Sequence, residues 1–299
     1  MNSEATCLIC HCPDYTVVYQ SGNRPHNSPQ KYLISEDRLT PPERIVKCTQ
    51  CGFVYAHPRI ETQDVLSAYI HMHDENYIKE EVGRRASARI ILNLLEKFCK
   101  DKGRLLDIGC STGFLLNEAQ KRGWEVAGVE LSEWAAEYAK KNFHLNIYNT
   151  NLEKAGIPEN SYDVVVMQDT IEHLLNPRGV LEEINRILKP GGILYVNTPD
   201  IESNSSRLLR AKWWGINQFH LYYFSRKTLT KLLTACGFKP FKYVSHERIF
   251  SFRYWMQRFE TYNQFIHRIL VVFSEKLNFN DKLLRINLWD QIGVFSRKV

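Results

Sequence analysis

Four cysteines near the start of the chain have the spacing of metal ligands. Cys7 and Cys10 form one Cys-x-x-Cys pair, and Cys48 and Cys51 form a second. Two residues between cysteines let both sulfurs of a tight turn reach a single ion. Two such turns make the closed, tetrahedral four-thiolate site of structural zinc. A redox pair or unliganded thiols are the alternatives, but the repeated pair favours a structural Zn2+ site.

The residues around the two pairs agree with a metal-held module. Gly52 follows the second pair and suits the sharp turn of a zinc knuckle. The stretch between the pairs is rich in Pro, Ser, Asn and Gln. It cannot build a core of its own, so a metal would have to hold it. His11 and Cys12 are substitute ligands that we rank below the four cysteines.

The second group of chemistry-bearing residues lies in GRLLDIGCSTGFLLNEAQKRGWEVAGVELS, residues 103–132. A short apolar strand, a turn from Gly109 to Gly113, a helix and a second strand ending at Glu130 form a βαβ unit. A dinucleotide needs Gly-x-Gly-x-x-Gly, whereas these glycines are spaced Gly-x-x-x-Gly. Asp107 would repel a pyrophosphate but suits an ammonium group. S-adenosylmethionine carries an ammonium group and no phosphate, and Glu130 would bind its ribose hydroxyls.

Four stretches, in this order, resemble class I S-adenosylmethionine-dependent methyltransferases: LLDIGCSTGFLL, YDVVVMQDTIEHLLNP, ILKPGGILYVNTP and HLYYFSRKTLTKLLTACGF. The closer likeness is to small-molecule enzymes found with polysaccharide and sugar biosynthesis. In those, a Cys-x-x-Cys … Cys-x-x-Cys-Gly-x-x-Tyr module precedes the catalytic domain. The resemblance implies an α/β fold, a Rossmann-like seven-stranded sheet with helices on both faces. It also makes the N-terminal zinc ribbon a cap on the substrate side.

The resemblance assigns cofactor contacts to residues at the ends of strands. Asp107 would face the methionine amino group, and Asn151 and Leu152 would flank the adenine. Asn151 stands where the family more often has Asp, and each assigned residue has an alternative role in a turn or a cap. The full set is Asp107, Gly109, Cys110, Gly113, Glu130, Leu131, Asn151, Leu152 and Gln168.

Two histidines are the catalytic candidates. His220 is the first choice for a base, because sugar carbon-methyltransferases have a similar His before Tyr-Phe-Ser. Their motif includes a second His and a Glu that NQFH lacks, so O- and C-methylation stay equally open. His173 is expected to face the substrate or to be structural. Four aromatic residues could stack on a sugar ring or belong to the core: Trp213, Trp214, Tyr222 and Tyr223.

A metal at the catalytic site is an alternative that the sequence leaves open. Asp169, Glu172 and His173 would share one face if they were helical. Some quinone-biosynthesis O-methyltransferases resemble this pattern and bind a divalent metal there. Glu-His-Leu after the fourth strand is also widespread in class I enzymes without metal. We therefore favour the site without a metal.

The composition is that of a globular and mildly basic protein. The chain has 299 residues, a net charge of +6, 44% apolar residues and 24% charged residues. The positive residues are spread along the chain, so the charge permits an acidic partner without requiring nucleic acid. The expected units are a zinc-binding ribbon at 1–60, a helical linker at 61–100, a class I methyltransferase core at 101–245, a helical insertion at 246–285 and the last strand of the core sheet at 286–299.

Two stretches outside the expected core have apolar residues at helical spacing. Residues 84–100 should pack against the core. Residues 251–276 would form either an interfacial helix that reaches a lipid-linked substrate at a membrane or an insertion that packs on the core or on a second subunit. We favour packing, which leaves a homodimer open.

The start, MNSEATCLIC, has no basic segment followed by an apolar one, and no run of eighteen apolar residues exists. We therefore expect a cytoplasmic protein with reduced thiols. The main prediction is methylation of a small-molecule or glycan-type acceptor, with no nucleic-acid partner. One alternative is an RNA methyltransferase whose zinc ribbon grasps RNA, although no Asn/Asp-Pro-Pro-aromatic turn follows the fourth strand. The other is a cofactor-binding scaffold without catalysis.

Overall fold

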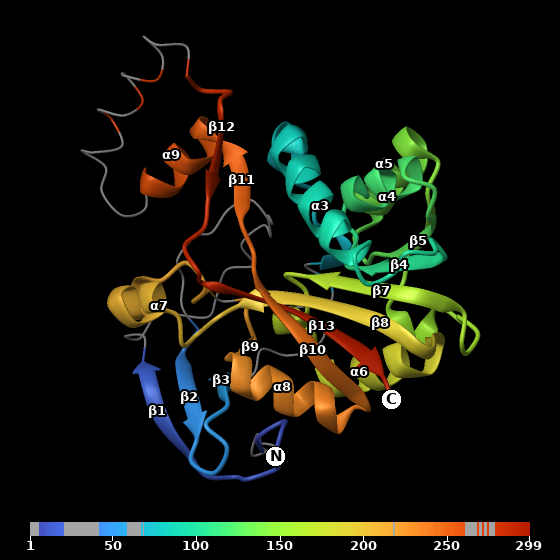
Figure 1. Ribbon diagram of the computed structural model, residues 1–299. Coiled ribbons are helices and arrows are strands. Elements are labelled where there is room, and N and C mark those ends of the chain that lie inside the picture. The colour runs from blue at the N-terminus through green and yellow to red at the C-terminus, as the bar shows by residue number, and fades with distance from the viewer. Residues whose placement is uncertain are drawn as a thin grey trace.

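A seven-stranded sheet forms the centre of the protein (Figure 1). The computed structural model describes residues 6–20, 42–58, 67, 69–217, 219–260, 268, 271, 274 and 279–299. The sheet has the order β10-β13-β8-β7-β4-β5-β6. Its strands are β4 (Arg104–Ile108), β5 (Glu125–Val129), β6 (Asn146–Tyr148), β7 (Tyr162–Gln168), β8 (Leu188–Pro199), β10 (Phe238–Ser245) and β13 (Gln291–Lys298).

Five of these strands are parallel and buried. Strands β8, β7, β4, β5 and β6 pair in parallel, with Leu106 opposite both Ala127 and Val165. Strand β13 is antiparallel and lies between β8 and β10. The sequence QIGVFSRKV predicted this last antiparallel strand, and the prediction is confirmed.

Helices cover both faces of the sheet, as predicted (Figure 1). Each turns an apolar stripe toward the strands; in α6 this stripe is Val180, Leu181, Ile184 and Ile187. The helices on one face are α3 (Glu81–Leu95), α4 (Phe114–Lys121) and α5 (Glu133–Phe143), and those on the other are α6 (Pro177–Ile187) and α8 (Arg226–Ala235). Residues 84–100 were expected to be helical, but α3 begins earlier and ends at Leu95.

Local sequence signals explain where the helices begin. The side chain of Ser225 accepts a hydrogen bond from the backbone of Thr228, whose hydroxyl accepts one from the Ser225 backbone. This reciprocal capping box starts α8. Ser132 and Asn176 cap α5 and α6 through the same kind of contact. The remaining short helices are α2 (Glu75–Lys79), α7 (Asn204–Leu209), η1 (Leu152–Lys154), η2 (Ile171–His173) and η3 (Arg210–Lys212).

A second, four-stranded sheet joins the N-terminal segment to the core. It has the order β1-β2-β3-β9, with every neighbouring pair antiparallel. Its strands are β1 (Tyr15–Gln20), β2 (Arg44–Cys48), β3 (Val54–His57) and β9 (Tyr222–Tyr223). Strand β9 belongs to the catalytic part of the chain, and Phe53 packs on its Tyr222 with ring centroids 5.8 Å apart. The N-terminal module is therefore built into the fold rather than appended to it.

The region before the last strand contains a pair of strands in addition to helix. Strands β11 (Arg248–Ser251) and β12 (Leu283–Ile286) pair antiparallel and bracket α9 (Phe252–Glu260). Most of the predicted 251–276 arm beyond residue 260 lies outside the described residues. Among all the described residues of the chain, no helix is long and apolar enough to cross a membrane.

Candidate functional site

The glycine turn between β4 and α4 approaches its neighbours so closely that side chains are excluded. Gly109 has φ +72°, and a Cβ there would lie 2.6 Å from Oγ1 of Thr170. Gly113 has φ +78°, and a Cβ there would lie 2.5 Å from Cδ1 of Leu145. Both positions combine a left-handed backbone with no room for a methyl group. The turn therefore presents bare backbone at the carboxyl edge of the sheet.

Two buried carboxylates flank this turn. Asp107 is 4% exposed and Glu130 is 7% exposed. The Glu130 carboxylate accepts hydrogen bonds from the backbone N–H groups of Ser111 and Ser132, at 2.8 Å each. Burial, and then the charge of Glu130, raise the pKa of Asp107 well above its usual value. Burying two carboxyl groups in one place is energetically unfavourable, and a positively charged ligand would compensate for it.

Two hydroxyl groups in the same turn also point to a ligand. The Oγ of Ser111 and the Oγ1 of Thr112 are buried and lack a hydrogen-bond partner among the described residues. Buried polar atoms are rarely left without a hydrogen bond. Bare backbone, two acids and two free hydroxyls fit a ligand with an ammonium group and several hydrogen-bonding groups, as expected for S-adenosylmethionine.

The other predicted cofactor residues differ in their burial and in their contacts with the rest of the protein. Cys110 is buried in the turn and packs against Gly128. A Cβ added to Gly128 would lie only 2.4 Å from Sγ of Cys110. Leu131 is half-buried after β5, and Gln168 is half-buried at the end of β7. Asn151 accepts a hydrogen bond from the backbone of Lys154 and caps η1, and Leu152 belongs to the apolar core. Their contacts with a cofactor stay predictions.

Three potential ligands meet next to the glycine turn. Glu172, His173 and His220 each offer one ligand atom, and these atoms lie within 4.8 Å of one another. The two imidazoles meet edge to face, with centroids 4.6 Å apart. We call these three residues the histidine cluster. The backbone N–H of Leu221 donates to the carbonyl of Glu172 at 2.9 Å, which ties the two segments together.

Backbone carbonyls orient both rings of the histidine cluster. Nδ1 of His173 lies 3.0 Å from the carbonyl of Phe219, and Nδ1 of His220 lies 2.7 Å from that of Gly215. Burial lowers the pKa of His173 to about 4. Burial, and then the nearby His173, lower the pKa of His220 well below its usual value. Each neutral ring therefore carries its hydrogen on Nδ1 and a lone pair on Nε2.

An Asx turn holds the segment that carries His220. The side-chain oxygen of Asn217 accepts hydrogen bonds from the backbone N–H groups of Phe219, at 2.9 Å, and His220, at 3.1 Å. The alternative in which His220 caps the following helix does not hold, because Ser225 caps it. His220 is thus free to take part in the cluster.

Asp169 does not join Glu172 and His173 as the helical pattern suggested. Only residues 171–173 form a helical turn, and Asp169 precedes it with φ +46°. Its carboxylate accepts hydrogen bonds from Asn197 at 3.2 Å and Gln291 at 2.9 Å. His220, from a distant segment, occupies the third place instead.

Some residues of the site carry no clear signal in the sequence. The hydroxyl of Thr198 donates to Oε2 of Glu172 at 2.9 Å. Tyr69 meets the ring of His173 edge to face at 5.9 Å. Thr198 could have been suspected only because β8 runs beside β7. Three of the four proposed sugar-stacking aromatics, Trp213, Tyr222 and Tyr223, are buried core residues.

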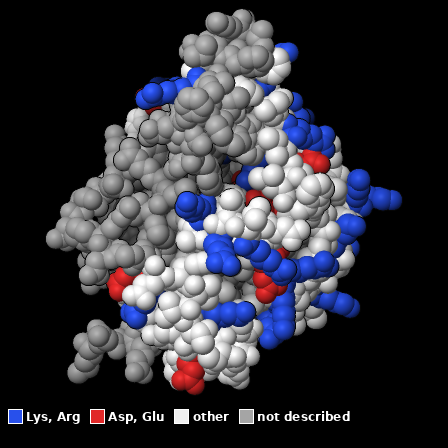
Figure 2. Space-filling model, turned by 90° about the vertical axis from the view of Figure 1, so that its left-hand side faces the viewer, with Lys and Arg blue, Asp and Glu red and all other residues white. Residues whose placement is uncertain are grey.

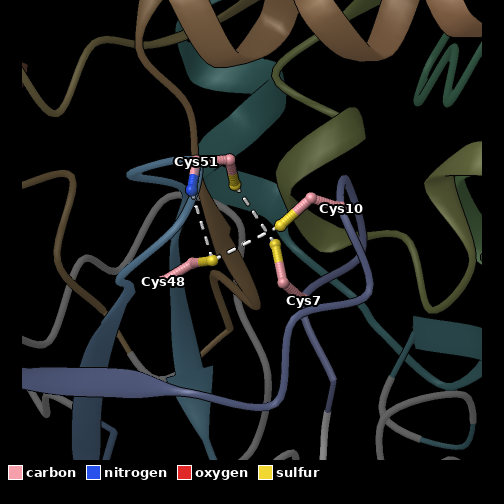
Figure 3. A group of neighbouring side chains, drawn as sticks. All are labelled: Cys7, Cys10, Cys48 and Cys51. Atoms are coloured by element: carbon pink, nitrogen blue, oxygen red, sulfur yellow. Dashed lines mark hydrogen bonds between the residues drawn. The ribbon is translucent and has the colours of Figure 1, made fainter.

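The four cysteines of the two pairs converge on one point. Figure 3 shows their thiol groups turned toward one another, and all four sulfurs lie within 4.8 Å. Sγ of Cys7 is 3.4 Å from that of Cys51, and Sγ of Cys10 is 3.5 Å from that of Cys48. Sulfurs around a tetrahedral zinc ion lie about 3.8 Å apart. The four unbridged thiols fit a structural zinc ion, and the described residues place neither His11 nor Cys12 in the set.

The sequence of the central region matches a family of known proteins. The family model described as a methyltransferase domain covers residues 78–242. The chain belongs to this family. The methyltransferase domain therefore includes the glycine turn, both buried acids and the whole histidine cluster.

Relatives of this methyltransferase domain are of several kinds. A Mycolicibacterium smegmatis protein named "Probable S-adenosylmethionine-dependent methyltransferase" is 30% identical over 139 residues, 45% of this chain and 51% of that one. A ubiquinone biosynthesis O-methyltransferase of Azoarcus sp. is 30% identical over 118 residues, 36% of this chain and 49% of that one. The chain thus spans about half the length of these curated relatives.

Solved methyltransferase structures also resemble this one. A geranyl diphosphate C-methyltransferase of Streptomyces coelicolor is 17% identical, with a TM-score of 0.49 over 72% of this chain and 77% of that one.

Proposed function

We propose that the protein is an S-adenosylmethionine-dependent methyltransferase acting on oxygen or carbon of a small-molecule or sugar/glycan-type acceptor. One observation carries this proposal: Thr170, two residues before Glu172 of the histidine cluster, contacts Gly109 of the glycine turn. Thr170, one residue before η2, donates its hydroxyl to the carbonyl of Gln168 at 2.7 Å, with the carbonyl of Ile108 at 3.3 Å, and packs on Gly109. A methyl donor in the turn would therefore lie beside two neutral imidazoles.

Different residues of this chain would bind the cofactor and activate the acceptor. S-adenosylmethionine, when bound, supplies a methyl group activated by its positively charged sulfur. Asp107 would hold the ammonium end of that cofactor, and Glu130 its ribose hydroxyls. A hydroxyl or carbon acid must lose a proton as it gains a methyl group. The free lone pair on Nε2 of His220 would accept that proton, and His173 would help to position the acceptor.

Two observations support a small-molecule acceptor. The core resembles enzymes of sugar and polysaccharide biosynthesis, and one relative carries the name of an O-methyltransferase for a small molecule. Arg248 stacks on the ring of the half-buried Trp214 at 3.8 Å and occupies the face that a sugar would use. Recognition of a glycan-type acceptor would therefore depend on polar groups near the histidine cluster.

The test begins with the cofactor and then adds acceptors. Calorimetry should detect binding of S-adenosylmethionine and of its demethylated product to the zinc-loaded protein. A cofactor with a labelled methyl group is then incubated with nucleotide sugars, phenols and RNA. We expect label in a small molecule, loss of transfer in His220→Gln, and unchanged cofactor binding in that variant. Absence of cofactor binding by folded protein would refute the proposal.

An RNA acceptor is the second candidate. Figure 2 shows Lys and Arg side chains over much of the described part of one face, with few Asp and Glu among them. Such a face can attract phosphates. Label incorporated into RNA, with binding that weakens steeply as salt increases, would replace the small-molecule acceptor by RNA. Cofactor binding with no transfer to any acceptor would favour the scaffold without catalysis.

A further inference from the structure

The histidine cluster has the properties of a metal site. We propose that Glu172, His173 and His220 together bind one divalent ion of the borderline class, such as Zn2+. This site is separate from the four cysteines and differs from them in its donor atoms, which are two nitrogens and one oxygen.

The positions of the three donor atoms fit a single ion. They lie within 4.8 Å of one another. Imidazole nitrogens and carboxylate oxygens bind zinc at about 2.0–2.2 Å, so ligands of one ion lie roughly 3–3.5 Å apart. Metal binding would draw the three donor atoms together to that separation. The backbone bond between Leu221 and Glu172 already fixes the two segments relative to each other.

In each of the three side chains one polar atom is already hydrogen-bonded to the protein. The other polar atom, which we call the inner atom, is left for a metal: Nε2 of each histidine and Oε1 of Glu172. Each histidine uses Nδ1 on a backbone carbonyl, at 3.0 Å for His173 and 2.7 Å for His220. Glu172 uses Oε2 to accept the hydroxyl hydrogen of Thr198 at 2.9 Å. Metal ligands are typically oriented by such outer contacts, with the opposite atom directed at the ion.

The inner atoms are three electron-pair donors without a shared partner. Glu172 is 1% exposed, and its Oε1 is buried without a hydrogen bond in the part of the chain that the structure describes. Burying an unpaired carboxylate oxygen is strongly unfavourable. A proton on Glu172 could be donated to only one of the two Nε2 atoms. One cation would satisfy all three donor atoms at once.

Three protein ligands leave at least one coordination position for another group. If the proposed methyl transfer is correct, that position would receive an oxygen of the acceptor, because the cluster lies beside the glycine turn. A bound divalent ion lowers the pKa of a hydroxyl group. The ion would then take over the activation of the acceptor that we otherwise assign to His220.

Manganese can report on this site without interference from the cysteines. The protein is first loaded with one equivalent of Zn2+, which the four thiolates take because soft sulfur ligands favour zinc. Mn2+ binds N and O ligands and is the weakest competitor in the divalent series. Electron paramagnetic resonance then measures bound Mn2+ per chain. We expect one bound ion in the wild-type protein.

Variants connect the signal to the cluster. Glu172→Gln and His220→Gln should each weaken Mn2+ binding at least about a hundredfold, because outer contacts alone are worth about 10–100-fold. Thr198→Val keeps all three ligands and should weaken binding about tenfold or more. His71→Ala, at an exposed histidine outside the cluster, is the matched control and should bind as the wild type does. Circular dichroism identifies any variant that fails to fold.

Two results would overturn the inference. One is folded, zinc-loaded protein that takes up neither Mn2+ nor Co2+ beyond the cysteine site. The other is Mn2+ binding that is unchanged in folded Glu172→Gln and Thr198→Val. Calorimetry with S-adenosylmethionine on the same samples separates the two proposals. Cofactor binding without Mn2+ binding removes only the metal site, whereas Mn2+ binding without cofactor binding removes only the methyltransferase.

Discussion

At the scale of single residues, the site concentrates groups that a stable core would avoid. Asp107 and Glu130 are both buried carboxylates, and the hydroxyls of Ser111 and Thr112 have no hydrogen-bond partner in the described part of the chain. Each of these features is unfavourable for folding. A ligand that neutralises the acids and bonds the hydroxyls explains why such residues occur together at one turn.

Replacing one of the two acids should weaken the cofactor. We expect Asp107→Asn to raise the dissociation constant of S-adenosylmethionine about tenfold or more. A hydrogen bond to a charged group contributes about 1.5–3 kcal/mol, and 1.4 kcal/mol corresponds to tenfold. Isothermal titration calorimetry measures the change. Asp101→Asn, at an exposed position before β4, is the matched control, and equal effects of both changes would contradict the assignment.

Local spacing brings the predicted cofactor residues together, whereas the catalytic set forms only in the folded chain. Asp107, the glycine turn and Glu130 lie within one βαβ unit, so local spacing brings them together. His220 and Glu172 belong to distant segments, and their meeting depends on how the chain folds after β8. The helical spacing of Asp169 was misleading because the chain forms only a short turn at 171–173.

At the scale of elements, one buried acid joins two helices. Glu118 in α4 accepts hydrogen bonds from Arg85 at 2.8 Å and Arg89 at 2.7 Å, both in α3. Burial alone would raise the pKa of Glu118. The hydrogen bonds from Arg89, Arg85 and Lys121 outweigh burial and hold the pKa at about 2.

This network should make stability depend on pH below the ordinary pKa of a glutamate. The unfolded carboxyl titrates near 4.5 and the folded one near 2, so the unfolded chain binds more protons between these values. The unfolding free energy therefore falls as pH drops from 4.5 toward 2. The wild type should lose up to about 3 kcal/mol more than Glu118→Gln over this window.

Urea unfolding at several pH values, followed by circular dichroism, measures this difference. Glu125→Gln is the matched control, because that carboxyl is largely exposed in its pair with Arg104. It should keep the wild-type pH dependence. Equal pH slopes for wild type and Glu118→Gln would show that the network has no such effect.

The N-terminal sheet should depend on its metal. Cys48→Ser removes one of four ligands, and structural zinc contributes binding free energy of about 10 kcal/mol or more to small modules. We expect loss of the thiolate-bound zinc and a lower melting temperature. Cys12→Ser is the control, because Cys12 lies by Asp14 and Thr49 instead of in the set. Zinc analysis and thermal unfolding of both variants decide the question.

Elements with strong local signals were predicted well, and those made by distant pairing were not. Strands β5 and β7 ended where the sequence placed their ends, at Val129 and Gln168. Strand β9 has two residues and exists because β3 pairs with it. The β11–β12 pair lies at the two ends of the expected helical insertion, and more than thirty residues of chain separate its strands, so no local signal predicted the pairing.

At the scale of the whole molecule, β9 connects the N-terminal cysteine module to the histidine cluster. Strand β9 pairs with β3 of the module and begins two residues after His220. The glycine turn belongs to the other sheet. Loss of the N-terminal zinc should therefore disturb the acceptor side more than the cofactor side.

Metal removal can test this separation. Cys48→Ser should abolish methyl transfer while changing the affinity for S-adenosylmethionine by less than about threefold, which is below 1 kcal/mol. Calorimetry and the labelled-methyl assay measure the two properties on one sample. Cofactor affinity lost in parallel with activity would mean that the two sheets depend on each other.

The place of β13 has a consequence for the synthesis of the protein. Residues 291–298 pair with β8 on one side and β10 on the other, so β10 has no place in the central sheet until residues 291–298 have left the ribosome. A nascent chain that ends at Asp290 would expose the apolar edge of β8 to solvent and to other chains. Newly made molecules should therefore rely on chaperones until β13 has emerged, and pulse-labelled chains truncated at Asp290 should be recovered in chaperone complexes.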